Sequence, residues 1–489
     1  MPERVCLIGL DCVPPELVFD RWTADLPSLR SLMDAGLYGP LESTIPPITV
    51  PAWMCMMTGR DPGELGIYGF RNRMDRTYDR LRHATSAQVR QPAVWDLLGD
   101  AGRRSILLGI PLTYPPRPIS GLIVSDFLAP DTDSDYTWPP ELKAEIRKAV
   151  GDYTLDVRRF RERDRGELLR EIHAMTDQRF RLARWLLRTK PWDLFAMVEM
   201  GPDRMHHAFW RHMDPSHRLH EPGSPYSGAI HDYYVALDRH LGALLDDLPL
   251  DTLVLVVSDH GAKRMDGAFC LNEWLLREGF LALTERHATP AALDPDRVDW
   301  DRTTAWGDGG YYGRVFLNVR GREPRGTVDP QDYARVRDDL ARRLEAVVDE
   351  SGRPLGTRVF RPEHCYRAVN GIAPDLIAYF GDLHWRSVGS VGHGTLWLRE
   401  NDTGPDDANH AQHGILILAQ KTAGGWRGAG GVRRDDLSLY DVAPTILEAL
   451  GLRPPEGLAQ TPLARDHRSP YTEEEEAEIA RRLEELGYL

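Results

Sequence analysis

The sequence is poor in cysteine, with only five among 489 residues. They are scattered along the chain, and no two of them form a C-x-x-C pair: Cys6, Cys12, Cys55, Cys270 and Cys365. This number and spacing argue against a disulfide framework and are typical of reduced thiols. We therefore expect a cytoplasmic protein.

Long hydrophobic runs are also missing. The apolar run nearest the N-terminus, VCLIGL at 5–10, ends at Asp11. It is too short for a signal sequence or for a membrane span, which needs about 20 apolar residues. No other stretch approaches that length, so we expect no association with a membrane.

Positive charge is not in excess either, because 60 Lys and Arg stand against 74 Asp and Glu, a formal net charge of −14. Such a balance argues against a nucleic-acid polymer or an anionic membrane as partner. It does not argue against a small anionic substrate, since bound metal ions can reverse the local field. The hydrophobic content of 42% and charged content of 27% are those of a soluble globular protein.

Short, uninterrupted apolar runs recur and predict strands that are buried on both faces. They occupy 5–11, 105–111, 121–127, 194–200, 251–260 and 414–420. Helical patterns separate them, at 26–36, 93–102, 166–188, 230–248 and 439–452. This alternation predicts an α/β fold with a mainly parallel central sheet covered by helices on both faces.

Between two of these strands the pattern changes, which predicts an inserted α+β subdomain over 261–409. We expect a hairpin at 309–328 and a helix at 332–350 within it. The Pro-, Asp- and Arg-rich stretch 131–165 is interpreted as a smaller insertion. The catalytic core then comprises 1–130, 166–260 and 410–466, followed by a charged helix at 467–489.

One threonine stands out in TIPPITVPAWMCMMTGR, residues 44–60. Pro51 suits the first turn of a helix, which places Thr49 at the N-terminus of that helix. Thr49 could cap the helix with its hydroxyl. It could also be a nucleophile whose developing negative charge is stabilised by the helix dipole and free N–H groups.

Three predicted strands lead into carboxylates, namely Asp11, Asp203 and Asp259. Ligands bind beyond the carboxyl ends of parallel strands. Three acids at one edge would repel one another unless cations neutralised them. His207, four residues after Asp203 on a helix, and His260 add imidazoles suited to bind metal.

A further nitrogen donor is expected from late in the chain. His410 and His413 both precede the strand at 414–420, and His393 in SVGHGT is a third candidate. Mixed nitrogen and oxygen ligands suit two divalent cations, zinc best and manganese next. Two such cations about 4 Å apart form a clamp for in-line displacement at phosphorus.

In this order the residues resemble the alkaline phosphatase superfamily, and most closely its type I phosphodiesterase/nucleotide pyrophosphatase branch. GLD after the first strand, TVPAW, TGR-x-P-G-x-x-G-I, PD-x3-H, SDHG and DVAPTILEALGL carry the likeness, which spans nearly the whole chain. The resemblance implies one metal site of Asp203, His207 and His410, and a second of Asp11, Asp259 and His260, bridged to Thr49. It further implies a covalent phospho-threonine at Thr49 that water then hydrolyses.

One position departs from that family. Nucleotide pyrophosphatases place an Asn about 21 residues after the nucleophile, where this chain has Phe70, which leaves Asn72 and Arg71 as candidates to replace it. We expect Trp53 and Phe70 to line an apolar wall for the leaving group. The alternatives to a phosphodiesterase are a phosphomonoesterase of the same superfamily and a non-catalytic metal-binding protein that keeps the fold.

Overall fold

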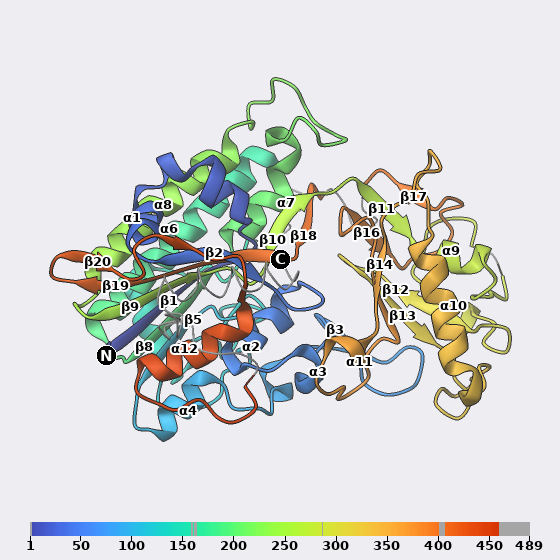
Figure 1. The fold of residues 1–489 in the computed structure, drawn as a ribbon, viewed down its shortest axis with the longest axis horizontal. Coiled ribbons are helices and arrows are strands. Elements are labelled where there is room, and N and C mark those ends of the chain that lie inside the picture. The colour runs from blue at the N-terminus through green and yellow to red at the C-terminus, as the bar shows by residue number, and fades with distance from the viewer. Residues whose placement is uncertain (1, 158–159, 161–163, 286, 401–405, 459–489) are drawn as a thin grey trace, which may run out of the picture.

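The computed structural model of the protein describes residues 2–157, 160, 164–285, 287–400 and 406–458. A large α/β part, on the left in Figure 1, carries the N-terminus. A smaller part on the right is built from residues in the middle of the chain. The charged helix predicted at 467–489 lies outside the described residues.

The main sheet has eleven strands, in the order β21-β2-β19-β9-β1-β8-β5-β6-β7, with β20 beside β19 and β22 beside β2. The strands are β1 Arg4–Leu10, β2 Leu37–Glu42, β5 Ser105–Leu108, β6 Gly121–Val124, β7 Thr137–Trp138, β8 Leu194–Glu199, β9 Thr252–Val257, β19 His413–Thr422, β20 Gly425–Arg427, β21 Val432–Arg433 and β22 Leu437–Ser438. The run from β9 through β1, β8 and β5 to β6 is parallel. β19 pairs antiparallel with β9. The predicted mainly parallel sheet is confirmed.

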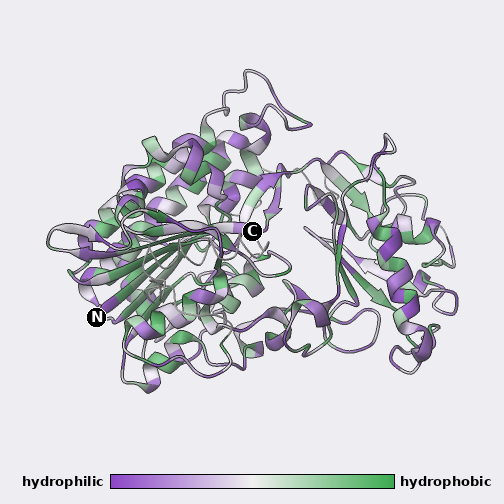
Figure 2. Ribbon diagram, in the orientation of Figure 1, coloured by the Kyte–Doolittle hydropathy of each residue, from purple (hydrophilic) through white to green (hydrophobic). Residues whose placement is uncertain are grey.

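Helices cover both faces of this sheet, with α1, α6 and α8 on one side and α2, α4 and α12 on the other (Figure 1). The α-helices are α1 Pro27–Ala35, α2 Thr49–Thr58, α3 Pro62–Leu65, α4 Val94–Asp100, α5 Leu142–Val150, α6 Arg165–Thr189, α7 Gly201–Met213, α8 Ala229–Asp247, α9 Leu271–Arg277, α10 Tyr333–Glu345, α11 Pro362–Cys365 and α12 Val442–Ala449. The sheet strands are strongly hydrophobic in Figure 2, because helices shield them on both faces. All ten residues of α2 are buried, which explains why its sequence is apolar all round.

The smaller part has its own hydrophobic core, centred on residues such as Phe269, Trp306 and Leu340. Its sheets are β12-β13-β15-β14 and β16-β11-β17, and a short hairpin, β3-β4, lies nearby. The strands are β3 Arg71–Arg73, β4 Leu81–His83, β11 Gly267–Cys270, β12 Ala305–Asp308, β13 Gly313–Leu317, β14 Arg358–Phe360, β15 Leu376–Tyr379, β16 Trp385–Val388 and β17 Trp397–Leu398.

An antiparallel pair connects the two parts. β10 (Gly261–Arg264) leads away from the main sheet, and β18 (Ala408–Ala411) returns to it. In this register His410 lies opposite Ala262, only two residues beyond His260. The strand pair therefore brings a late histidine next to the end of β9.

One local prediction needs correction, and the structure adds two features that were not predicted. The hairpin predicted at 309–328 is formed earlier, by β12 and β13, with Ala305 opposite Leu317. The stretch 131–165 supplies β7 to the edge of the main sheet as well as helix α5. β2 escaped prediction because its sequence, LYGPLE, contains Gly and Pro, which are poor strand formers.

Within the described residues, none of the helices combines the length and the apolar character that crossing a bilayer requires.

Candidate active site

Three buried carboxylates meet at one edge of the main sheet. β9, β1 and β8 are neighbours and run parallel. Asp11 directly follows β1, Asp259 comes two residues after β9, and Asp203 lies in the first turn of α7, which follows β8. Their exposed fractions are 0%, 0% and 3% respectively.

Asp11, Asp259 and His260 form the first cluster, and each offers a donor atom within 4.8 Å of the others. His260 Nε2 lies 3.1 Å from Asp259 Oδ2 and 3.9 Å from Asp11 Oδ1. His260 Nδ1 is 3.2 Å from the carbonyl oxygen of Gly261, to which it can donate. That contact favours the tautomer in which Nε2 keeps a free lone pair for a metal ion.

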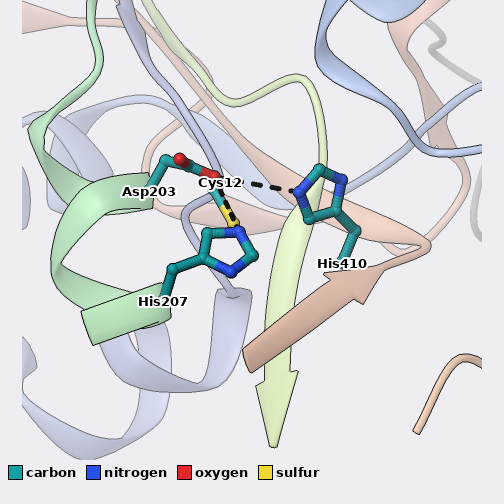
Figure 3. Close-up of side chains that lie close together, drawn as sticks. All are labelled: Cys12, Asp203, His207 and His410. Atoms are coloured by element: carbon teal, nitrogen blue, oxygen red, sulfur yellow. Dashed lines mark ion pairs between the residues drawn. The ribbon is translucent and has the colours of Figure 1, made fainter. Parts of the chain in front are cut away.

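Asp203, His207 and His410 form the second cluster, together with the thiol of Cys12 (Figure 3). Asp203 Oδ1 lies 3.1 Å from His207 Nε2 and 3.8 Å from His410 Nε2. The Nδ1 atoms again contact fixed oxygens, at 2.6 Å from Asp406 Oδ1 for His207 and 2.9 Å from the Pro47 carbonyl for His410. All three imidazoles thus present Nε2 towards the carboxylates.

The two clusters abut. The rings of His260 and His410, one from each cluster, are stacked with their centroids 3.8 Å apart. Thr49 Oγ1 lies 3.2 Å from His260 Nε2 and is buried, with 3% exposure. The hydroxyl of Thr49 therefore sits beside the first cluster.

The buried donors fit metal ions. Asp11 Oδ1, Asp259 Oδ2 and His207 Nε2 are buried and have no hydrogen-bond partner, which is costly in a protein interior. Burial, and then the charge of Asp203, raises the pKa of Asp11 well above its usual value. Burial and the charge of Asp11 do the same to the pKa of Asp259. Bound cations would satisfy these atoms and keep both acids ionised.

Two of the three imidazoles, those of His260 and His410, are held in the neutral form that binds metal, whereas at His207 the charges of Tyr311, Asp406 and Asp203 outweigh burial and raise the pKa well above its usual value. Burial lowers the pKa of His260 to about 4. Burial and the positive charges that His260 and His207 would carry lower the pKa of His410 well below its usual value. Neutral imidazole is the ligating species, so these side chains need not lose a proton when a metal ion binds near neutral pH.

Thr49 does not cap its helix. It is the first residue of α2, whose N-cap is Ile48, and no side chain makes a capping hydrogen bond there. The hydroxyl instead points to His260. The capping role considered from the sequence is therefore wrong, and Thr49 lies at a helix N-terminus where negative charge is favoured.

Comparison with known proteins agrees with this geometry. The family model of type I phosphodiesterases and nucleotide pyrophosphatases matches residues 5–415. The chain belongs to that family. It is thus a metal-dependent hydrolase of phosphoric esters, and the resemblance drawn from its motifs is confirmed. None of the curated protein sequences matches it.

Solved structures share the fold at low sequence identity. Human ectonucleotide pyrophosphatase/phosphodiesterase 5 is 14% identical, with 92% of this chain and 96% of that chain covered and a TM-score of 0.51. Phosphonoacetate hydrolase from Sinorhizobium meliloti, in complex with phosphonoformate, is 16% identical over the same shares, with a TM-score of 0.57. An inactive threonine-to-alanine variant of the murine phosphodiesterase 5, in complex with AMP, is 13% identical over 92% and 95%, with a TM-score of 0.51.

Of the three late histidines, the structure brings only His410 into the donor clusters. His410 is 2% exposed. His413, the first residue of β19, is exposed at the surface. His393 lies in a loop, with Nε2 2.8 Å from the Ser390 hydroxyl. Although His413 is only three residues after His410, its imidazole lies outside the site.

We expect His410→Ala to weaken binding of one zinc ion strongly, because the second cluster then loses a nitrogen donor. His413→Ala is the matched control and should bind zinc like the wild type. Titration of metal-free protein with zinc, followed by calorimetry, measures both. Equal affinities of His410→Ala and the wild type would remove His410 from the ligand set.

The residues predicted to contact substrate occupy three different settings. Trp53 is fully buried, and its indole N–H donates to Asp11 Oδ2 over 2.7 Å. Asn72 accepts from the Tyr68 N–H and donates to the Gly69 carbonyl, so both ends of its amide hold the loop together. Phe70 is half-buried and packs against Phe127, with the ring centroids 6.2 Å apart. Of the two residues predicted to line an apolar wall, Trp53 is fully buried and Phe70 is partly exposed.

Three residues that contact the donor clusters are not predicted from the sequence. Cys12 directly follows Asp11, but the spacing of the cysteines predicts only a scattered thiol there. Asp406 lies four residues before His410, and this spacing within DDANH could have signalled it. Tyr311 stacks on His410 with the centroids 4.1 Å apart, and no sequence signal marks it.

Proposed function

We propose that the protein is a two-metal phosphodiesterase in which Thr49 is the nucleophile. The observation that carries this proposal is the buried Thr49 hydroxyl, 3.2 Å from His260 Nε2, at the junction of two donor clusters. Asp11, Asp259 and His260, with Thr49, would hold one cation. Asp203, His207 and His410 would hold the other. Nitrogen and oxygen donors, with the Cys12 sulfur nearby, favour zinc over manganese.

The cations would supply charge that favours the Thr49 alkoxide and neutralises the phosphoryl oxygens. Thr49 Oγ1 attacks phosphorus in line with the leaving oxygen, forming the Oγ1–P bond as the P–O bond to the leaving group breaks. The N-terminus of α2 stabilises the negative charge near Oγ1. Water then cleaves the phospho-threonine, which releases the phosphate monoester and regenerates the hydroxyl.

The fixed orientations of the histidines support catalysis. Asp406, the Pro47 carbonyl and the Gly261 carbonyl each engage one Nδ1 atom, so the imidazoles are held before substrate arrives. Trp53 holds Asp11 in the same way. An inactive threonine-to-alanine variant of the murine relative gives independent support for a threonine in this role.

The ion pairs of Arg204 favour a diester substrate over a monoester. Its guanidinium pairs with Asp203 and, through Nε and Nη2, with both carboxylate oxygens of Asp156. A monoester dianion carries one more negative charge than a diester and gains most from a free arginine. Because Arg204 is already paired twice, it is a poor clamp for that extra charge.

We expect hydrolysis of bis-p-nitrophenyl phosphate at least 10-fold faster than hydrolysis of p-nitrophenyl phosphate in the presence of zinc. Release of nitrophenol, measured at equal substrate concentrations, tests this. A faster monoester reaction would instead identify a phosphomonoesterase. Absence of both reactions with both metals bound would leave a metal-binding protein without this activity.

We also propose that the protein works in a reducing cytoplasm. All five cysteines are free thiols, and four of them are buried.

A further inference from the structure

A pocket lies between the β3–β4 hairpin and the smaller part of the molecule. Its volume is about 360 Å³, and its lining includes Arg71, Tyr78, Trp306, Gly310, Arg386 and Ser387. Gly310 directly precedes Tyr311, whose ring stacks on His410. The guanidinium of Arg386 lies over the Tyr311 ring, 4.7 Å from its centroid. One aromatic ring therefore connects this pocket to the donor clusters.

One wall of the pocket is made of tightly packed aromatic side chains. Tyr78 and Trp300 stack face to face at a centroid distance of 3.5 Å, and Trp306 meets both edge-on, at 5.4 Å and 5.2 Å. Trp300, Trp306 and Phe316 are only 4%, 6% and 5% exposed. Locked aromatic walls of this kind suit a flat ring, because binding does not have to order them first.

Hydrogen-bond donors dominate the polar part of the lining. Asp308 is the acid there, and its two oxygens face Arg314 and, at 3.8 Å, Arg71. The Arg71 side chain is half-exposed, and this long contact leaves most of its hydrogen-bonding capacity unused. In a protein of net charge −14, such a donor-rich pocket indicates an anionic ligand.

Two buried polar atoms in this lining lack partners. Ser387 is 1% exposed, and its Oγ has no hydrogen-bond partner. Arg386 Nε is likewise buried and unpartnered, although Nη1 lies 3.3 Å from Asp406 Oδ2. Unsatisfied buried donors are rare in native proteins, so a ligand that accepts hydrogen bonds is their natural complement.

We propose that this pocket binds one ester group of the substrate, namely a ring that carries a second anionic group such as a carboxylate or a phosphate. The ring packs against Tyr78 and Trp306, and the anion accepts hydrogen bonds from Arg71, Arg386 and Ser387. The inference rests on the proposed phosphodiesterase function and specifies its substrate class.

Two matched diesters test the proposal: 4-carboxyphenyl 4-nitrophenyl phosphate and its neutral analogue, 4-carbamoylphenyl 4-nitrophenyl phosphate. We expect the wild type to prefer the carboxylate about 10-fold in kcat/KM, because charge-assisted hydrogen bonds are roughly twice as strong as neutral ones. Arg71→Gln should bring that ratio close to one. Using the ratio cancels any change in overall activity. A third diester, with a phosphate in place of the carboxylate, shows which anion the pocket prefers.

Arg82→Gln is the matched control, since Arg82 is an exposed arginine on β4 of the same hairpin and does not line this pocket. It should keep the wild-type ratio. Equal kcat/KM values for the two diesters in the wild type would overturn the pocket assignment and leave the phosphodiesterase standing. An unchanged ratio in Arg71→Gln would also overturn it.

If neither diester nor bis-p-nitrophenyl phosphate is hydrolysed, the proposed function fails, and calorimetry with benzoate and benzamide tests the pocket alone. Tighter binding of benzoate that Arg71→Gln abolishes would support the anion site. Equal binding of benzoate and benzamide would refute it.

Discussion

Thr49→Ala should lose essentially all turnover of bis-p-nitrophenyl phosphate while the protein still folds and binds metal. The substitution removes the attacking oxygen, and loss of a nucleophile costs several powers of ten in kcat. Folding should survive because the Thr49 hydroxyl makes no capping bond and contacts only His260 among the hydrogen bonds of the described residues. On the same preparation, steady-state kinetics measure turnover, circular dichroism measures folding, and metal analysis measures metal binding.

Thr49→Ser is the matched variant. It keeps the oxygen and loses a methyl group, so we expect reduced but measurable activity. Thr44→Ala is the control, because Thr44 is also buried, but its hydroxyl donates to the Pro46 carbonyl outside the donor clusters. If Thr49→Ala kept more than a small fraction of the wild-type kcat, Thr49 could not be the nucleophile.

Chelation should abolish activity, and the active protein should contain two divalent metal ions per chain. The physical reason is the convergence of three buried carboxylates, two of which keep an unpartnered oxygen. Asp203→Ala should lower the metal content towards one, because only the second cluster loses its carboxylate. Elemental analysis of dialysed wild type and variant measures the stoichiometry, and zinc or manganese added to the chelated protein measures recovery.

Asp34→Ala serves as the control for removal of an acid, since Asp34 pairs with Arg30 on the surface and its side chain is 69% exposed. It should keep two metal ions and full activity. One metal ion or none in fully active wild type would rule out the two-metal mechanism. Loss of both ions in Asp203→Ala, with the fold intact, would show that the two sites do not fill independently.

The parallel strands explain why much of the site could be predicted. Asp11, Asp203 and Asp259 follow apolar runs that form adjacent parallel strands, and such strands end at the same edge of a sheet. His207 follows from the four-residue spacing on α7, and His260 from its place next to Asp259. Local rules sufficed because each of these side chains is positioned by the element that directly precedes or contains it.

Side chains whose polar groups are engaged in hydrogen bonds within the fold could not be predicted in this way. The sequence predicts Trp53 as a substrate contact; in the structure its N–H donates to Asp11, 42 residues away in sequence. The sequence predicts a substrate contact for Asn72 as well; in the structure its amide bonds to the Tyr68 N–H and the Gly69 carbonyl. A polar group that is hydrogen-bonded within the protein is not available to a substrate. Its partner is known only once the chain is folded.

The sequence by itself determined the fold class, the family, and the residue types and chain order of the donors, because hydrophobic periodicity and strand-end position are local properties. Only the tertiary structure decided which late histidine joins them. The pairing of β10 with β18 places His410, not His413 or His393, beside Asp203. The tertiary structure likewise turned the Thr49 hydroxyl towards His260 and gathered Arg71, Trp306 and Arg386 around one pocket. Those outcomes depend on register and packing between segments hundreds of residues apart, which no local pattern encodes.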